Sequence, residues 1–251
     1  MLDENYLSFI TDLKNRGFEI ALHNVGSGKF TRKEIIDGFN IFNRELGFCP
    51  RLHINHASNT DNIYWGYERY KFPLKNAMEL IYGGKRKYYG TDIESDYFWG
   101  DICKEKITYI RNYTFNDINT LKVDPRMPYI DKDKEKYSNF WFSSSDGHTV
   151  NEFNALLAKD NIDRLESEGG ACIVYTHFAS QFVDSAGRLD REFARNMEYL
   201  SGKNGWFVPA STLLDYLLKQ RENKYVTRNY LRRLDFRWAL DRVVKRLRFK
   251  R

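Results

Sequence analysis

Three short apolar segments of this chain end in histidine or amide side chains, a combination that could carry proton transfers. The last of them reads Gly-Ala-Cys-Ile-Val-Tyr-Thr-His-Phe over residues 170–178, so four strand-forming residues lead into His177. Two earlier segments have the same form. The first supplies His23 and Asn24, and the second supplies His53, Asn55 and His56. In alternating βα folds the carboxyl ends of strands face a shared ligand crevice, and imidazole exchanges protons near neutral pH. The pattern therefore predicts a barrel or sheet enzyme with histidines at its rim.

A fourth candidate group is the sequence Ser-Asp-Gly-His at 145–148, which follows a predicted strand at 139–142. We expect Asp146 and His148 to face the same crevice as the other histidines, because a carboxylate with imidazoles suits metal binding or acid–base work. The alternative is that Asp146 only forms a turn or caps the following helix, since Asp-Gly is common in turns.

The polar residues after the earlier strands are predicted to bind substrate. Asn55 and His56 follow a strand at 52–54, and Asn24 and Ser27 follow a strand at 18–22. Of the two histidines near residue 55, one is expected to be structural, because side chains alternate between the faces of a strand.

The elements that would position these residues alternate between helix and strand. A capping box at Thr31-Arg-Lys-Glu34 predicts a helix that ends near Leu46, before Gly47. Other predicted strands are 107–110, 172–175 and 205–208, and other predicted helices are 6–16, 150–168, 190–200 and 211–218, the last capped by Ser211. This alternation predicts an α/β domain with a mainly parallel sheet.

Charge and cysteine content indicate which partners and which cell compartment to expect. Residues 228–251 hold ten Arg or Lys against two Asp, which exceeds the whole net charge of +6. They are expected to form a basic amphipathic helix that docks on the protein, rests on an anionic membrane, or binds a polymer with carboxylate or phosphate groups. Because the positive charge is confined to this segment, no nucleic acid partner is expected. Three separate cysteines and the lack of a leader or a long apolar run favour the cytoplasm, with the inner membrane face as the peripheral alternative.

Several motifs, in this order, resemble those of polysaccharide deacetylases. Residues 17–23 are similar to the family motif that supplies a metal-binding histidine, here His23, and residues 172–177 are similar to the motif that supplies a catalytic histidine, here His177. The segment 205–217 resembles the last strand and helix of that fold. The resemblance implies a distorted or incomplete (β/α)7 barrel over residues 1–222. The remaining residues, 223–251, hold the basic helix that the charge pattern predicts. The resemblance also implies a divalent metal, zinc above all, that activates water for deacylation of sugars.

Two features depart from the family. The family strand that carries two aspartates precedes the first helix, and this sequence begins at that helix. The second metal-binding histidine of the family is replaced by Ser27, so His23 alone matches a metal ligand. Three explanations remain open, namely a chain truncated at its N-terminus, a divergent enzyme and a degenerate binding protein.

The sequence thus predicts a hydrolase that removes an acyl group from an amino sugar or a glycan precursor. The expected catalytic residues are His177, Asp146 and His148, the expected substrate-binding residues are Asn55, His56, Asn24 and Ser27, and the expected metal ligand is His23. The alternative is a carbohydrate-binding barrel without catalysis.

Overall fold

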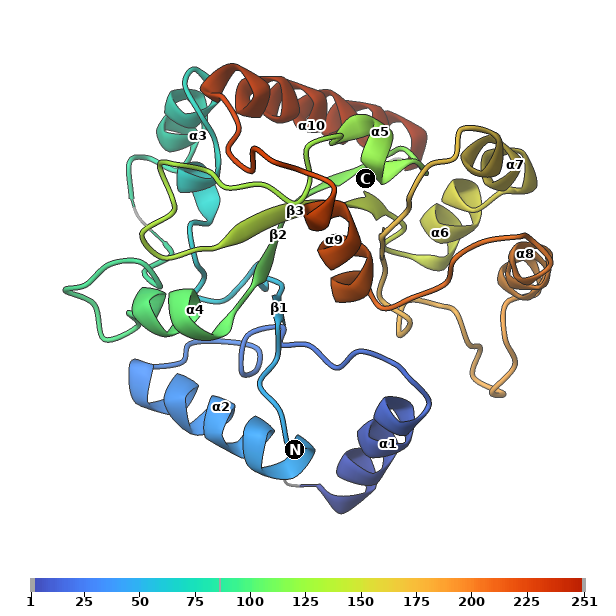
Figure 1. The fold of residues 1–251 in the computed structure, drawn as a ribbon, viewed down its shortest axis with the longest axis horizontal. Coiled ribbons are helices and arrows are strands. Elements are labelled where there is room, and N and C mark those ends of the chain that lie inside the picture. The colour runs from blue at the N-terminus through green and yellow to red at the C-terminus, as the bar shows by residue number, and fades with distance from the viewer. Residues whose placement is uncertain (1–2, 86, 250–251) are drawn as a thin grey trace. The chain divides into compact units, whose positions relative to one another are not determined.

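Four parallel strands form the sheet of this protein, and helices occupy most of the connecting segments (Figure 1). The computed structural model describes residues 3–85 and 87–249. Residues 1, 2 and 86 of the expected barrel and residues 250 and 251 of the expected basic helix lie outside the described residues. The strands are β1 (Leu52–His53), β2 (Tyr109–Phe115), β3 (Phe140–Asp146) and β4 (Val174–Tyr175). They are hydrogen-bonded in the order β1-β2-β3-β4, and β1 pairs with β2, and β3 with β4, in parallel. The α/β class predicted from the sequence is confirmed.

Helices lie before, between and after the strands, but the expected alternation is only partial, because the described segments 18–22 and 205–208 form no strand. Before β2 the helices are α1 (Glu4–Asn15), α2 (Arg32–Leu46), the short 3-10 helix η1 (Gly66–Arg69), α3 (Leu74–Ile81) and α4 (Gly100–Lys106). After β2 they are α5 (Thr120–Val123), α6 (Val150–Leu156), α7 (Lys159–Ser167), α8 (Arg191–Ser201), α9 (Ala210–Lys219) and α10 (Arg228–Phe249). Among the described residues, no helix has both the length and the apolar content that a membrane-crossing segment needs.

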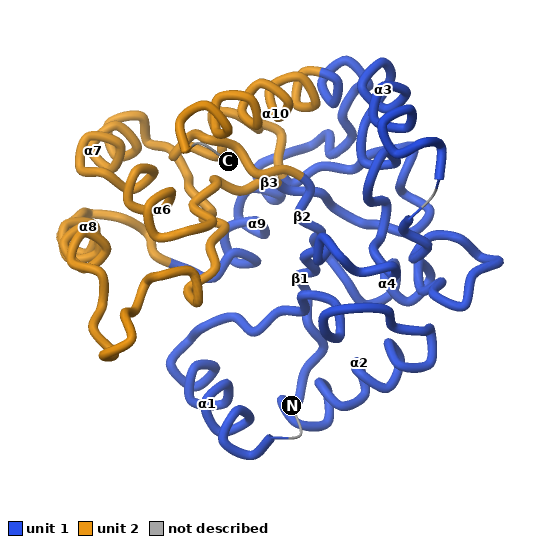
Figure 2. Tube along the Cα trace, turned by 180° about the vertical axis from the view of Figure 1, so that it is seen from behind, with its two compact units in different colours: residues 1–112, 128–142, 208–232 blue, residues 113–127, 143–207, 233–251 orange. Residues whose placement is uncertain are grey.

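The chain divides into two compact units (Figure 2). Unit 1 comprises residues 1–112, 128–142 and 208–232, and unit 2 comprises 113–127, 143–207 and 233–251. Strands β2 and β3 and helix α10 each contribute residues to both units. Compactness does not test independent folding, so the expected division into 1–222 and 223–251 stays a prediction.

Local signals in the sequence explain the best predicted helix. Thr31 accepts a hydrogen bond from the Glu34 N–H, the Glu34 carboxylate accepts from the Thr31 N–H, and together they close the capping box of α2. At the other end Gly47 has a φ of 76°, a left-handed conformation that glycine adopts without strain. The predicted bounds of α2 are therefore confirmed.

Other predicted elements were wrong in extent. The expected strand 18–22 is reduced to one bridge between Leu22 and His53, and 205–208 forms no strand. Helix α9 begins at Ala210 with Pro209 as its cap, and the Ser211 N–H donates to the Glu19 carboxylate at 3.0 Å.

The expected helix 150–168 is two helices, α6 and α7. The chain turns at Ala158, which has an extended backbone with a ψ of 148°. The Asn161 amide then donates to the carbonyls of Ala155 and Leu156, each at 3.1 Å, which satisfies groups that the break would leave unpaired. Sequence periodicity did not show this break, because the apolar spacing continues across it.

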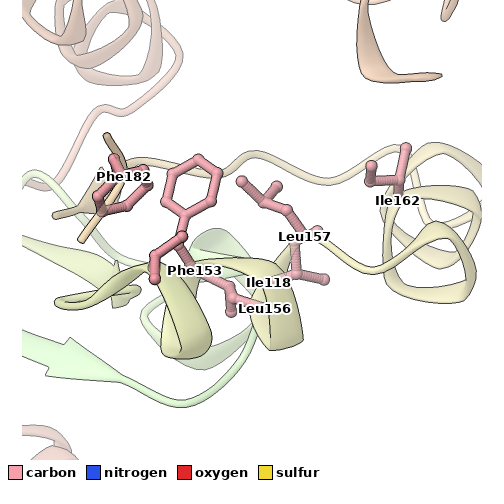
Figure 3. Close-up of a cluster of buried hydrophobic side chains, with 7 residues drawn as sticks. Ile118, Phe153, Leu156, Leu157, Ile162 and Phe182 are labelled. Carbon is pink, nitrogen blue, oxygen red and sulfur yellow. The ribbon is translucent and has the colours of Figure 1, made fainter. Parts of the chain in front are cut away.

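Unit 2 has its core beside α6, α7 and α8 (Figure 3). The rings of Phe153 and Phe182 meet edge to face, with centroids 5.3 Å apart. The buried members of this cluster are Ile118, Val150, Phe153, Leu156, Leu157, Ile162 and Phe182. Each buried side chain of this size contributes about 1.5–3 kcal/mol, so the cluster fixes the helices that flank β3 and β4.

Two buried tryptophans lie in the core of unit 1. Trp99 is buried, its ring lies 5.0 Å from that of His53, and its indole N–H donates to the Asp61 carbonyl at 2.5 Å. Trp141 is buried as well, with the Lys134 ammonium 4.8 Å from its ring.

Candidate functional site

The register of two strands brings His148 and His177 together in unit 2. Asp146, the last residue of β3, lies opposite Tyr175, the last residue of β4. The residues two positions beyond each strand end are therefore neighbours, and the ring centroids of His148 and His177 are 4.6 Å apart. The His177 N–H donates to the His148 carbonyl at 3.1 Å, which ties the two turns together. Both imidazoles are half-buried, so they combine a fixed position with access to solvent.

Tyr175 forms the third side of this histidine pair. Its ring stacks on His148 with centroids 5.6 Å apart and meets His177 edge to face at 5.2 Å. An aromatic ring against both imidazoles limits their rotation. The prediction that strand ends gather histidines is therefore confirmed for this pair.

Asp146 belongs to a buried ion-pair network. It is the last residue of β3, because β3 extends four residues beyond the predicted strand end. The alternative that Asp146 forms a turn or caps the following helix is therefore wrong, and Thr149 caps that helix. One carboxylate oxygen lies 2.5 Å from Arg242 Nη2 and the other lies 3.0 Å from Lys245 Nζ. Lys245 also lies 2.7 Å from a Glu152 oxygen.

This pairing determines the charge state of Asp146. Burial acts to raise the pKa of its carboxyl group, but the charges and hydrogen bonds of Arg242 and Lys245 outweigh burial and lower the pKa. Asp146 is therefore an anion at neutral pH, neutralised by two cations. Its catalytic role stays a prediction, and the contacts that the structure assigns to it anchor α10.

The second histidine pair lies in unit 1. The bridge between Leu22 and His53 places the two chain segments side by side in parallel. The rings of His23 and His56 then meet edge to face, with centroids 4.8 Å apart. His23 Nδ1 lies 2.8 Å from the Ile54 carbonyl, and His56 Nδ1 lies 2.8 Å from the Ser58 hydroxyl.

The amides expected to bind substrate are occupied by the loop that carries His56. Asn24 is buried, donates to Asp61 at 2.5 Å, and accepts from the His56 N–H at 2.9 Å. Asn55 is buried too, and its amide both donates to and accepts from the backbone of Ile63, each at 2.9 Å. These two side chains position the loop 54–63, and their contact with substrate stays a prediction.

Ser27 lies in a loop that is held by a residue the sequence reasoning missed. Asn59 is buried, accepts from the Gly28 N–H at 2.9 Å and donates to the Gly26 carbonyl at 2.8 Å. Ser27 is exposed between these two anchored glycines. The polar run 55–62 was the only signal for this role, and it does not show which amide faces inward.

His53 is the structural histidine of the pair near residue 55. It is fully buried, its Nε2 lies 3.1 Å from the Asn55 side-chain oxygen, and burial lowers its pKa to about 4. Such an imidazole is neutral at physiological pH and packs like an aromatic ring.

The residues described here do not fit the metal site that the resemblance implies. Within residues 3–85 and 87–249, no three His, Cys, Asp or Glu side chains gather as a metal-binding group. His23 has His56 beside it but Ser27 at the position of the second family ligand, and the Asp146 carboxylate faces two cations. A catalytic zinc site needs three protein ligands.

Comparison with known proteins leaves the family open. The chain matches no protein-family model, no curated protein and no solved structure. The likeness to polysaccharide deacetylases therefore rests on the motifs of the sequence.

Proposed function

We propose that this protein is a polysaccharide-deacetylase-like hydrolase that removes an acyl group from an amino sugar or glycan precursor. The observation that carries the proposal is the pair His148 and His177 at the ends of two hydrogen-bonded parallel strands, with ring centroids 4.6 Å apart. Strands joined in chain order, as they are here, are typical of a barrel and not of a doubly wound sheet. This order supports the distorted barrel that the resemblance implies.

The two imidazoles suit the two proton transfers of amide hydrolysis. His148 takes a proton from water, the hydroxide oxygen bonds to the acyl carbon, and the carbon–nitrogen bond breaks as His177 gives a proton to the sugar nitrogen. This step starts with His148 neutral and His177 protonated. The products are the free amine and a carboxylic acid, which ionises to a carboxylate in water, and the proton on His148 returns to His177 before the next turnover. General acid–base catalysis of this kind contributes about 10²–10⁴-fold. No step is assigned to a metal, because the described residues do not fit that site.

The test is hydrolysis of N-acylated amino sugars, followed by detection of the released carboxylate and amine. We expect His177→Gln and His148→Gln each to lower kcat by at least about 100-fold while sugar binding persists. Ser180→Ala is the matched control. Ser180 contacts His177 through its backbone, whose N–H donates to the His177 carbonyl at 2.8 Å, and alanine keeps that hydrogen bond. Full activity in His177→Gln would overturn the assignment.

The second candidate is carbohydrate binding without catalysis, and a cavity in unit 1 favours it. The cavity holds about 270 Å³ and is lined by Tyr64, Glu68, Tyr70, Lys71, Phe72, Lys75, Asp133, Lys134, Arg228 and Arg232. Three aromatic rings and more cations than carboxylates suit a sugar that carries an anionic group. Sugar binding that Arg232→Gln weakens, with no turnover by the intact protein, would favour this candidate over the hydrolase.

A further inference from the structure

Helix α10 has the reverse of the usual polarity of a surface helix. From Arg233 onward the buried residues are Leu234, Asp235, Asp241 and Lys245, so three of the four are charged. Of the five large aliphatic residues in this segment, Leu234 is buried and the other four are exposed. A helix on a globular protein normally buries its apolar stripe and exposes its charges. The exposed apolar residues of α10 therefore need an explanation other than the core.

Charged contacts within unit 2 hold the inward face. The Asp235 carboxylate accepts a hydrogen bond from the Tyr113 hydroxyl. Asp241 accepts from the Asn116 N–H at 2.7 Å, and the pairs of Arg242 and Lys245 with Asp146 complete the contact. These bonds fix how the helix is rotated, so the outward face is defined.

That outward face is a continuous apolar stripe. Phe236, Leu240, Val243 and Leu247 recur at intervals of four, three and four residues, which places them on one side of a helix. Their side chains are 52%, 63%, 56% and 78% exposed. Val244 borders the stripe and is 53% exposed. Exposed apolar stripes of this kind mark contact with a protein or a membrane.

Positive charge flanks the stripe on both sides. On a helical wheel Arg233 and Arg237 lie along one edge, and Arg246 lies along the other. All three are exposed. Arg237 is paired with Asp241 at 3.0 Å and with Asp117 at 3.8 Å, so the charge offered to a partner is assigned to Arg233 and Arg246. Between Arg233 and Phe249, all described, the acidic residues are Asp235 and Asp241, and both are buried. The outward surface of this segment therefore combines apolar and cationic side chains without an exposed carboxylate.

We propose that this outward face of α10 rests on an anionic membrane surface. The apolar stripe enters the boundary between headgroups and acyl chains, and the flanking arginines contact lipid phosphates. Charge complementarity selects this partner over a second copy of the chain, because two such faces would bring their arginines together. The inference does not depend on the proposed hydrolase activity.

The test is sedimentation of the full chain with vesicles of phosphatidylcholine alone or mixed with phosphatidylglycerol. We expect binding to the mixed vesicles only, and loss of that binding in about 0.5 M salt. Leu240→Glu/Leu247→Glu should lower partitioning by at least about 10-fold, and each of Arg233→Gln and Arg246→Gln by about fivefold. Leu80→Glu is the matched control, because Leu80 is 82% exposed on α3.

Circular dichroism of each variant verifies that the fold is intact. Failure of the unaltered chain to bind the mixed vesicles would overturn the proposal, and so would equal binding by Leu240→Glu/Leu247→Glu. If the unaltered chain forms a dimer in solution and Leu240→Glu/Leu247→Glu is monomeric, the outward face binds a second copy of the chain and the proposal is wrong. Variants that no longer bind vesicles should still hydrolyse the sugar substrate, because membrane binding and the proposed hydrolysis do not depend on each other.

Discussion

Replacing Asp146 with asparagine distinguishes a structural from a catalytic role for this carboxylate. The substitution keeps the shape of the side chain and removes a charge whose side chain is 1% exposed. Breaking a buried ion pair by removing one partner costs about 3–5 kcal/mol. We expect a loss at the lower end, about 3 kcal/mol, because Lys245 keeps Glu152 at 2.7 Å and the Arg242 side chain is 28% exposed.

Urea unfolding at neutral pH measures this loss. With an m-value of about 3 kcal/mol per M, the urea midpoint should fall by about 1 M. Asp12→Asn is the control, because Asp12 pairs with Arg16 at 3.5 Å on an exposed helix face, and its midpoint should not move. The double variant Asp146→Asn/Arg242→Gln should lose at least about 1 kcal/mol less free energy of unfolding than the two single variants lose together.

The pH dependence gives an independent measurement. The folded pKa of Asp146 lies below its ordinary value of 3.8, so its stabilising contribution is present at neutral pH and disappears as pH falls below about 4. The midpoints of the unaltered protein and Asp146→Asn should therefore converge in acid. Equal midpoints at neutral pH, together with lost hydrolysis in Asp146→Asn, would refute the structural role and support catalysis.

Three further perturbations address positions that the fold makes sensitive. Burial of His53 lowers its pKa from 6.5 to about 4, so the free energy of unfolding should fall by about 3 kcal/mol as the pH falls from 6.5 to 4. In His53→Gln, the urea midpoint should change less over this pH range than in the unaltered protein. A Cβ on Gly90 would lie 2.2 Å from the Asp61 carbonyl oxygen, so Gly90→Ala should cost about 1–3 kcal/mol in urea unfolding, whereas Gly202→Ala, whose nearest contact is 3.6 Å, should cost almost nothing. Thr31→Ala removes the cap of α2 and should cost about 1 kcal/mol in the same assay, and an unchanged midpoint would contradict the role of the capping box.

Local signals in the sequence predicted the elements whose stability is local. The capping box and the glycine after Leu46 define α2 through hydrogen bonds within a few residues. Helix α8, which was also predicted, has a local cap as well, since the Asp190 side chain accepts from the Phe193 N–H at 2.8 Å. The segment 205–208 has strand-forming residues, yet it forms no strand, because a strand also requires a hydrogen-bonding neighbour that the sequence does not specify.

The same distinction separates what the sequence determined about the candidate site from what the tertiary structure decided. Strand-forming runs that lead into histidines predicted that imidazoles would gather at strand ends. Only the pairing of Asp146 with Tyr175 decided that His148 and His177 are neighbours, because register depends on contacts between distant segments. The same holds for Asp146 itself, whose two cationic partners come from a helix about a hundred residues later in the chain. Residue type determines which chemistry a side chain can perform, but the side chains packed around it determine whether that chemistry is available.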